Sequence, residues 1–248
     1  MLSSFTVAAL DLVFPALCPV CDTTLGAGRR DPLCGTCWSA ISRLGAPWCD
    51  RCGAASIVTE TVPPCVAPRL TCALCASDLP PYDYARSAAL YEGPLRDAIH
   101  ALKFSGRRAL ASPLGDLAAE QCAASLPDTI DALIPVPLAR TRERERGFNQ
   151  AALLARRIGS HLHVPIRSSW LARIRSTRPQ SELSATERRA NVRDAFRASN
   201  RVAGHHVLVV DDILTTGATL DACARALRAA GARRVGVLTV ARVVHPAV

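Results

Sequence analysis

Two adjacent carboxylates and a short threonine-rich turn lie next to each other near the carboxyl end of the chain. The carboxylates are Asp211 and Asp212, and the turn runs through Thr215, Thr216, Gly217, Ala218 and Thr219. Carboxylates accept hydrogen bonds from vicinal hydroxyls such as those of a ribose, and threonine hydroxyls with backbone N–H groups donate to phosphate oxygens. A ribose 5-phosphate would satisfy both groups at once. The absence of a Gly-Lys-Ser/Thr sequence excludes a Walker-type loop.

The elements around this segment place it where ligands bind in α/β proteins. Residues 207–210 are consecutive β-favouring apolar residues, which predict a strand buried on both faces of a parallel sheet and ending at the two carboxylates. A helix is predicted over 220–230, with Gly231 as its stop signal. Gly217 permits backbone dihedrals that a Cβ forbids. Ligands of open α/β sheets bind at the carboxyl ends of strands. The alternative is a buried strand with an acidic end and an ordinary capping turn.

The stretch 207–220 resembles the phosphoribosyl-pyrophosphate (PRPP) binding loop of type I phosphoribosyltransferases. The resemblance implies that Asp211 and Asp212 hold the ribose hydroxyls and are the catalytic residues. It also implies that residues 215–219 wrap the 5-phosphate, and that Mg²⁺ accompanies PRPP. The fold expected from it is a parallel sheet with helices on both faces.

Length and composition favour a folded, cytoplasmic protein. The chain has 248 residues, of which 49% are hydrophobic, enough for one large domain or two modest ones. No segment has the uninterrupted apolar length that crosses a bilayer. The first 17 residues are apolar, but they lack a basic start and Asp11 interrupts them, so we expect a short amphipathic helix and no signal peptide.

The net charge of +9 is concentrated in one part of the chain. Residues 140–201 carry fifteen arginines and only five acidic residues. This excess fits a polyanionic ligand or a nucleic acid, and the alternative is a solvated helical face in an arginine-biased chain. Lys103 is the only lysine, which suggests that a compact ammonium is wanted at that position.

Cysteines dominate the amino-terminal part. Eight of the eleven form four Cys-x-x-Cys pairs, which are Cys18/Cys21, Cys34/Cys37, Cys49/Cys52 and Cys72/Cys75. Each pair can present two thiolates to one metal, and two pairs complete a tetrahedral zinc site. Disulfides are the rival interpretation. The lack of a secretory signal and the nucleotide-type site on the same chain favour a reducing cytosol, where disulfides are rare. Cys65 is either a spare ligand or an unpaired thiol, and Cys122 with Cys223 fit core positions.

The chain divides into two predicted modules. A double zinc ribbon is expected over residues 1–79 and the phosphoribosyltransferase-like domain over 80–248, with Pro80-Pro81 at the join. In the second module, predicted strands at 85–91, 130–135, 163–166, 207–210 and 235–243 alternate with predicted helices ending near 102 and covering about 110–125, 151–160 and 220–230. Such alternation is typical of a parallel sheet covered by helices on both faces.

A second basic segment follows the predicted strand 130–135. Its best donors to phosphate oxygens are Arg144, Arg146, Asn149 and Gln150. In phosphoribosyltransferases the loop after this strand cradles pyrophosphate. By resemblance, residues 138–140 form the turn of that cradle, and Arg144 or Arg146 reaches in.

Residues 178–192 are too polar and arginine-rich for a core element. They suit a mobile flap that closes over a charged ligand and excludes water. The alternative is a plain surface loop and helix.

Taken together, these motifs resemble the ComF family over nearly the whole chain. The residues that carry the resemblance are the four cysteine pairs, 91–95, 102–104, 144–150, 180–191 and the Asp-Asp loop. The family is similar to the phosphoribosyltransferase half of glutamine–PRPP amidotransferases, with a zinc ribbon in front. Such proteins are linked to DNA uptake in naturally transformable bacteria, together with a helicase-like partner.

Three functions remain open from the sequence. The first is a phosphoribosyltransferase that uses PRPP and Mg²⁺ with structural Zn²⁺, in which no protein nucleophile is required. The second is an accessory protein for DNA uptake that binds single-stranded DNA through the arginine-rich stretch 140–201, with Phe148 or Trp170 for stacking. The third is a sensor that binds PRPP or a ribose 5-phosphate nucleotide without turnover.

Overall fold

A parallel four-stranded sheet forms the centre of the molecule. The computed structural model describes residues 16–26, 32–55, 70–175, 192 and 194–244. The strands are β1 (Tyr84–Leu90), β2 (Ala132–Pro135), β5 (His206–Leu214) and β6 (Arg234–Arg242), in the order β1-β6-β5-β2. All three neighbouring pairs are parallel. All carboxyl ends therefore lie at one edge, as predicted.

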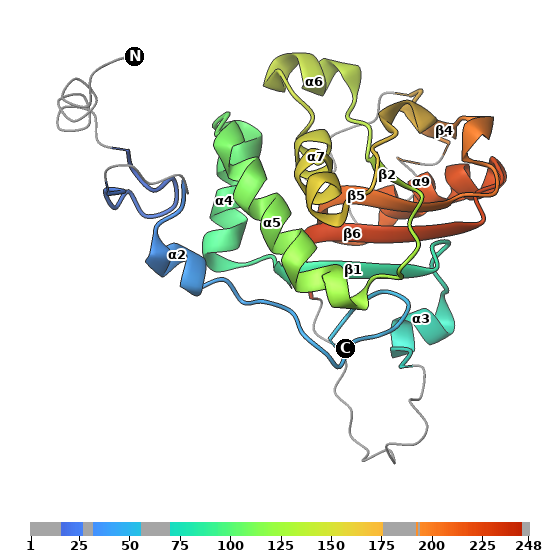
Figure 1. Cartoon of the computed structure of the whole chain (residues 1–248), viewed down its shortest axis with the longest axis horizontal. Helices are drawn as coiled ribbons and strands as arrows, with labels where there is room; N and C mark the ends of the chain where they lie inside the picture. The colour runs from blue at the N-terminus through green and yellow to red at the C-terminus, as the bar shows by residue number, and fades with distance from the viewer. Residues whose placement is uncertain (1–15, 27–31, 56–69, 176–191, 193, 245–248) are drawn as a thin grey trace, which may run out of the picture.

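Helices cover both faces of this sheet, which confirms the predicted layering. The long helices are α4 (Gly93–Phe104), α5 (Ala111–Cys122), α7 (Gln150–Leu162) and α9 (Ala218–Ala229). Figure 1 shows α5 and α7 crossing in front of the strands and α9 behind them. Strand β5 serves both layers: Leu208 and Val210 belong to the core with α5 and α7, whereas Val207 and Val209 belong to the core with α9. This alternation explains the uninterrupted apolar run.

The remaining described elements are short. They are the helices α2 (Gly35–Ser39), α3 (Ala73–Ser77) and α6 (Arg140–Arg146), the 3-10 turns η1 (Arg108–Leu110), η2 (Ala123–Ser125), η3 (Ser168–Trp170) and η5 (Asn200–Val202), and the antiparallel strands β3 (Leu171–Arg173) and β4 (Phe196–Ala198). Strands β3 and β4 pack against α9. Among the described residues, no helix is long and apolar enough to cross a membrane.

Strand β5 is longer than predicted, and the difference shapes the site. It does not end at the two carboxylates but runs through them to Leu214, because β6 continues to pair with it as far as Arg242. On the other side, pairing with β2 stops at Pro135 opposite Val210. The sheet therefore opens on the β2 side at the first carboxylate.

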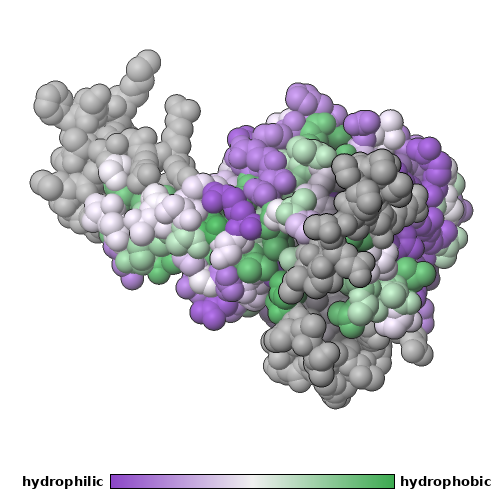
Figure 2. Space-filling model, turned by 90° about the horizontal axis from the view of Figure 1, so that it is seen from below, coloured by the Kyte–Doolittle hydropathy of each residue, from purple (hydrophilic) through white to green (hydrophobic). Residues whose placement is uncertain are grey.

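The amino-terminal segment covers the outer edge of β1. The N–H of Leu44 donates to Ala88 O and that of Leu90 to Ser42 O, both at 2.8 Å, which adds a short antiparallel bridge beside the parallel sheet. An exposed strand edge invites pairing with other chains, so this cover protects the sheet. Seen from below, the described surface mixes hydrophilic and hydrophobic residues (Figure 2).

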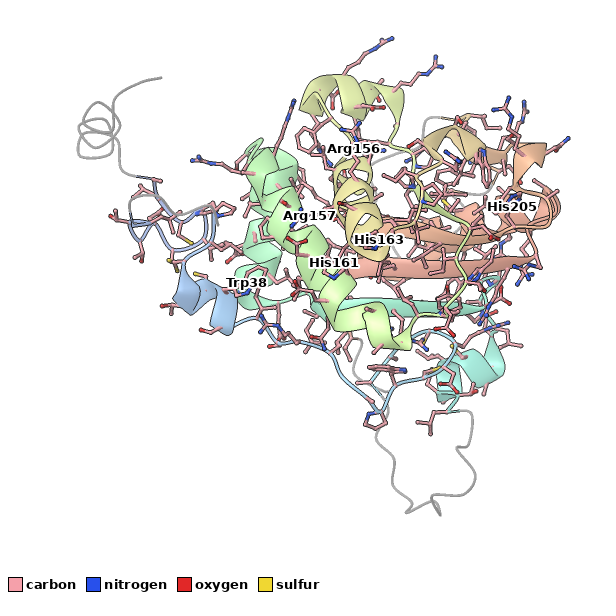
Figure 3. All side chains as sticks on the ribbon, in the orientation of Figure 1. Trp38, Arg156, Arg157, His161, His163 and His205 are labelled. Atoms are coloured by element: carbon pink, nitrogen blue, oxygen red, sulfur yellow. The ribbon has the colours of Figure 1, made fainter. Side chains whose placement is uncertain are left out.

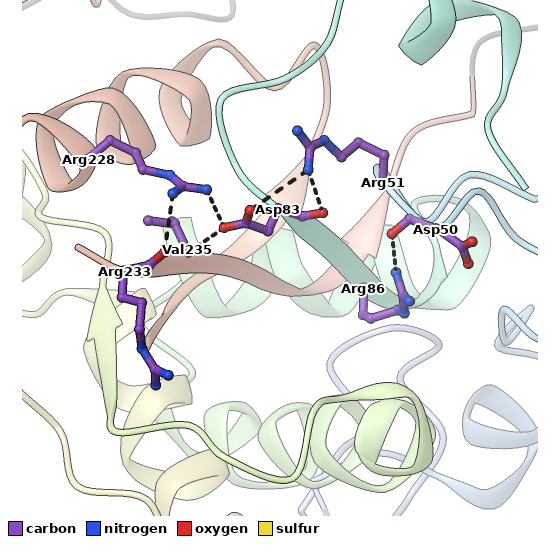
Figure 4. A network of polar contacts seen from close by, with 7 residues as sticks. All are labelled: Asp50, Arg51, Asp83, Arg86, Arg228, Arg233 and Val235. Carbon is purple, nitrogen blue, oxygen red and sulfur yellow. Dashed lines mark hydrogen bonds and ion pairs between the residues drawn. The ribbon is translucent and has the colours of Figure 1, made fainter. Parts of the chain in front are cut away.

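A polar network attaches the segment that contains the Cys49/Cys52 pair to the sheet. Asp83 accepts hydrogen bonds from Arg228 of α9 at 2.5 Å and from the Val235 N–H at 2.8 Å, while its backbone carbonyl accepts from Arg51 at 3.0 Å (Figure 4). Arg242 at the end of β6 donates to Cys52 O at 2.6 Å. Arg51 and Cys52 are thereby held to Asp83, the residue before β1, and to the end of β6.

Several predicted elements differ or fall outside the described residues. The strand at 163–166 does not form: only Ile166 bridges to Leu133, and His163 ends α7 in the left-handed conformation. The amphipathic helix expected at the amino terminus and Cys65 lie outside the described part, as does the predicted flap except Val192.

Candidate functional site

A pocket opens at the carboxyl ends of β2 and β5, where the sequence predicted a ligand. Its volume is about 180 Å³. It is lined by Lys103, Val136, Pro137, Leu138, Arg142, Gln150, Arg173, Asp211, Asp212, Ile213, Thr215, Gly217, Ala218, Thr219 and Leu220. Acidic, basic and hydroxyl groups from five separate segments meet there. The pocket therefore suits a ligand that carries both hydroxyls and anionic groups.

The two carboxylates have different surroundings. Asp212 is buried, pairs with the Lys103 ammonium and accepts a hydrogen bond from Gln150 at 3.4 Å. Burial alone would raise its pKa, but the Lys103 charge and its hydrogen bond hold the pKa below the ordinary aspartate value. Asp211 is half-buried, and desolvation together with the Asp212 charge raises its pKa well above the ordinary value. The pair thus holds one carboxylate firmly ionised beside one that a bound cation would help to ionise.

The threonine turn forms another part of the pocket wall. Thr215, Gly217, Ala218 and Thr219 line the pocket, whereas Thr216 belongs to the same turn without lining it. Gly217 has φ +80°, a left-handed conformation that favours glycine, and α9 begins at the next residue, two positions before the predicted start. The first N–H groups of a helix have no intrahelical partner and attract anions. The turn is therefore a suitable place for a phosphate.

The arginines after β2 lie on α6, a helix that the sequence analysis did not predict, and they point to two different sides of it. Residues four apart lie on one face of a helix and residues two apart on opposite sides. In α6, Arg142 lines the pocket, and Arg146 on the same face donates to Gln150 Oε1 at 2.5 Å. Arg140 and Arg144 instead line a separate shallow pocket with Glu143 and Gly147. The structure therefore brings Arg146 close to the two carboxylates and places Arg144 away from them.

Four polar or charged lining residues lie outside the set predicted for PRPP: Lys103, Arg142, Gln150 and Arg173. Lys103 could be singled out from the sequence because it is the only lysine of the chain. Gln150, expected as a phosphate donor, donates to Asp212 instead. Arg142 was recognisable only from the i, i+4 spacing to Arg146, and Arg173 comes from β3, which no pattern in the sequence indicated.

The eight cysteines form two separate clusters. Cys18, Cys21, Cys34 and Cys37 make one and Cys49, Cys52, Cys72 and Cys75 the other, with the sulfurs of each cluster within 4.8 Å of one another. A tetrahedral zinc with Zn–S bonds of about 2.3 Å requires S–S separations of about 3.8 Å. The Cys21–Cys34 and Cys52–Cys72 sulfurs lie 3.5 and 3.7 Å apart. Each cluster therefore fits one structural Zn²⁺.

Comparison with family models identifies both modules. Residues 118–247 match the phosphoribosyl transferase domain, and residues 9–76 match the double zinc ribbon domain. The first match includes β2, α6, α7, β5, α9 and β6, and hence nearly all residues that line the pocket. The second includes all eight clustered cysteines.

Individual relatives extend this result to most of the chain. The DNA utilization protein YhgH of Escherichia coli O157:H7 is 36% identical over 93% of this chain and 99% of its own length. The competence protein ComFC of Bacillus subtilis is 29% identical over 79% of this chain and 78% of its own. Among solved structures, the glutamine PRPP amidotransferase from Bacillus subtilis, complexed with ADP and GMP, matches 56% of this chain and 30% of its own at 22% identity, with a TM-score of 0.38.

Proposed function

The chain belongs to the ComF family, with a double zinc ribbon in front of a phosphoribosyltransferase domain, and from this we propose that its pocket binds PRPP with Mg²⁺. The protein then either transfers the phosphoribosyl group or senses PRPP or a ribose 5-phosphate nucleotide. We assign residues 1–79 to the ribbon and 80–248 to the PRPP-binding domain. Structural Zn²⁺ in the ribbon fits a reducing, cytoplasmic compartment.

The observation that supports this proposal is the meeting of the carboxylates and the threonine turn in one pocket. Asp211 and Asp212 accept hydrogen bonds from the ribose hydroxyls, and Thr215 to Thr219 surround the 5-phosphate. The roles follow from the chemistry of each group and from the family.

The basic residues supply the charge that a pyrophosphate requires. Arg142 lines the pocket, and Arg146 donates a hydrogen bond to Gln150, which also lines it. Both arginines therefore favour the negative charge that develops on a leaving pyrophosphate. Lys103 keeps Asp212 ionised at neutral pH. Carboxylate oxygens and substrate phosphates are the ligands that Mg²⁺ prefers, so Asp211 and Asp212 fit its binding together with PRPP. When bound, Mg²⁺ neutralises part of the phosphate charge.

The test is the binding of PRPP and Mg²⁺ to the double variant Asp211→Asn/Asp212→Asn, followed as a ligand-induced rise in melting temperature. We expect the wild type to be stabilised and the variant to show no shift. Glu120→Gln, which neutralises an exposed acid of α5 away from the pocket, is the matched control and retains the wild-type shift. An unchanged shift in the double variant would refute the proposal. Release of pyrophosphate from PRPP across a panel of amine and nucleobase acceptors then separates a transferase from a sensor.

The names of two relatives, a DNA utilization protein and a competence protein, support a second candidate. In this candidate function the chain is an accessory protein of DNA uptake that binds single-stranded DNA and works with a helicase-like partner. Helix α7 exposes Arg156 and Arg157 on its outer side, with His161 and His163 at its end (Figure 3). Arg157 already pairs with Asp116 at 2.6 Å, so only part of this charge is available.

DNA held by phosphate contacts loses affinity steeply as the salt concentration rises. For single strands, the logarithm of the binding constant falls by about 0.7 per phosphate contact for each tenfold rise in salt concentration. Binding of a single-stranded oligonucleotide that does not change between 50 and 200 mM salt, about a fourfold range, would exclude this candidate.

A further inference from the structure

An aromatic cluster lies on the surface beside the pocket. Tyr91 directly follows β1, and His100 and Phe104 belong to α4. The Tyr91 and His100 rings are stacked with centroids 6.4 Å apart, and those of His100 and Phe104 are 5.4 Å apart. The phenol of Tyr91 also shares a hydrogen bond of 2.9 Å with His100 Nε2. Only 4% of the chain is aromatic, so this grouping is a local concentration.

Phe104 is the exposed member of the cluster. The residue is 71% exposed although it is a large apolar side chain at the end of a well-packed helix. It is not needed for the core, because Leu95, Ile99 and Leu102 fill the buried face of α4. The ring therefore keeps free surface for a planar partner.

A short chain of contacts joins this ring to the carboxylates. The Arg146 guanidinium lies 5.5 Å from the centre of the Phe104 ring and donates to Gln150, which donates to Asp212. The neighbour of Phe104 in sequence, Lys103, lines the pocket. The aromatic surface is thus connected to the carboxylates proposed to hold the ribose.

We propose that Phe104 and His100 form a stacking platform for a nucleobase, so that the acceptor, or the base of a bound nucleotide, lies against Phe104 beside Arg146. Aromatic side chains stack on every base, and a neighbouring arginine adds a cation–π contribution. This inference rests on the proposed function, because the ribose 5-phosphate part occupies the carboxylates and the threonine turn. It specifies that the second substrate or ligand is planar and aromatic and not a simple amine.

The test compares the affinity of AMP, CMP, GMP and UMP with that of ribose 5-phosphate for the zinc-loaded full chain. At least one nucleotide is expected to bind about 5- to 150-fold more tightly than ribose 5-phosphate, the range of one base stacked on an aromatic side chain. Phe104→Ala should lose this advantage and keep the affinity for ribose 5-phosphate, and Phe104→Trp should retain it. Leu74→Ala, which truncates a side chain of 73% exposure in α3, is the matched control and changes neither affinity.

The outcomes separate the platform from the proposed function. If ribose 5-phosphate binds and no nucleotide binds more tightly, or if Phe104→Ala keeps the full advantage, the platform is refuted and the PRPP site stands. If neither ribose 5-phosphate nor PRPP binds to the wild type, the proposed function fails and the platform fails with it.

Discussion

Replacing Lys103 by Met removes the cation that faces Asp212 while keeping a side chain of similar length. The side chains of the pair are 18% and 5% exposed, which is close to a buried ion pair. Breaking a buried pair costs about 3–5 kcal/mol because a charge is left without compensation, whereas exposed pairs contribute at most about 1 kcal/mol. Because Lys103 retains some contact with solvent, we expect a loss of about 3 kcal/mol in the free energy of unfolding at neutral pH. For a chain of this size that corresponds to a fall of about 6–12 °C in melting temperature.

The loss of stability caused by Lys103→Met should depend on pH. In the wild type the pKa of Asp212 is lower in the folded than in the unfolded chain, so its ionised form stabilises the fold at neutral pH and this contribution is lost as the pH falls through the folded pKa. In Lys103→Met, burial raises that pKa without the compensating lysine charge, so Asp212 destabilises the fold at neutral pH and ceases to do so as it takes up a proton. The difference in melting temperature should therefore be larger at pH 8 than at pH 5.

The measurement is thermal unfolding of wild type and variants at pH 5 and pH 8. Arg96→Met removes an exposed ion pair on the same helix and should change the melting temperature little. The double variant Lys103→Met/Asp212→Asn should recover most of the lost stability and its dependence on pH. A Lys103→Met variant as stable as the wild type at both pH values would refute the pairing and the assignment of a lowered pKa to Asp212.

Zinc content and the stability of two glycine variants can be predicted in the same way. Cys18→Ser and Cys49→Ser should each lower bound zinc from two ions to one per chain, measured by elemental analysis, because each residue belongs to a separate cluster; loss of both ions in either variant would contradict this independence. Gly236→Ala places a Cβ 2.3 Å from the Tyr84 ring and should cost at least about 2 kcal/mol in urea unfolding, whereas wild-type stability would show that the ring moves freely. Gly217→Ala should cost about 1–2 kcal/mol from its left-handed backbone alone, since the Cβ meets no atom closer than 3.7 Å, and an unchanged unfolding midpoint would contradict that conformation.

The parts of the fold that local sequence encodes were predictable. The apolar run before Asp211, the glycine at 217 and the periodic helix after it lie within a dozen residues, so their pattern could be interpreted without the rest of the chain. The cysteine pairs were equally local, and the structure groups their sulfurs in sequential order. The predicted sheet and its two helical layers are confirmed for the same reason.

The composition of the pocket depended on tertiary structure. Lys103 meets Asp212 across more than a hundred residues of chain, and no local pattern joins them. The alternating charges of 140–146 have no apolar periodicity that would predict a helix. The different positions of Arg142 and Arg144 can be derived only once that helix is known. The extension of β5 to Leu214 depended on the length of its partner β6.

Calorimetric titration of the zinc-loaded protein with PRPP, with and without Mg²⁺, tests the central claim most directly. We predict saturable binding of one PRPP per chain that depends on Mg²⁺. Absence of binding at millimolar PRPP in the presence of Mg²⁺ would contradict the assignment of Asp211, Asp212 and the threonine turn to a PRPP site.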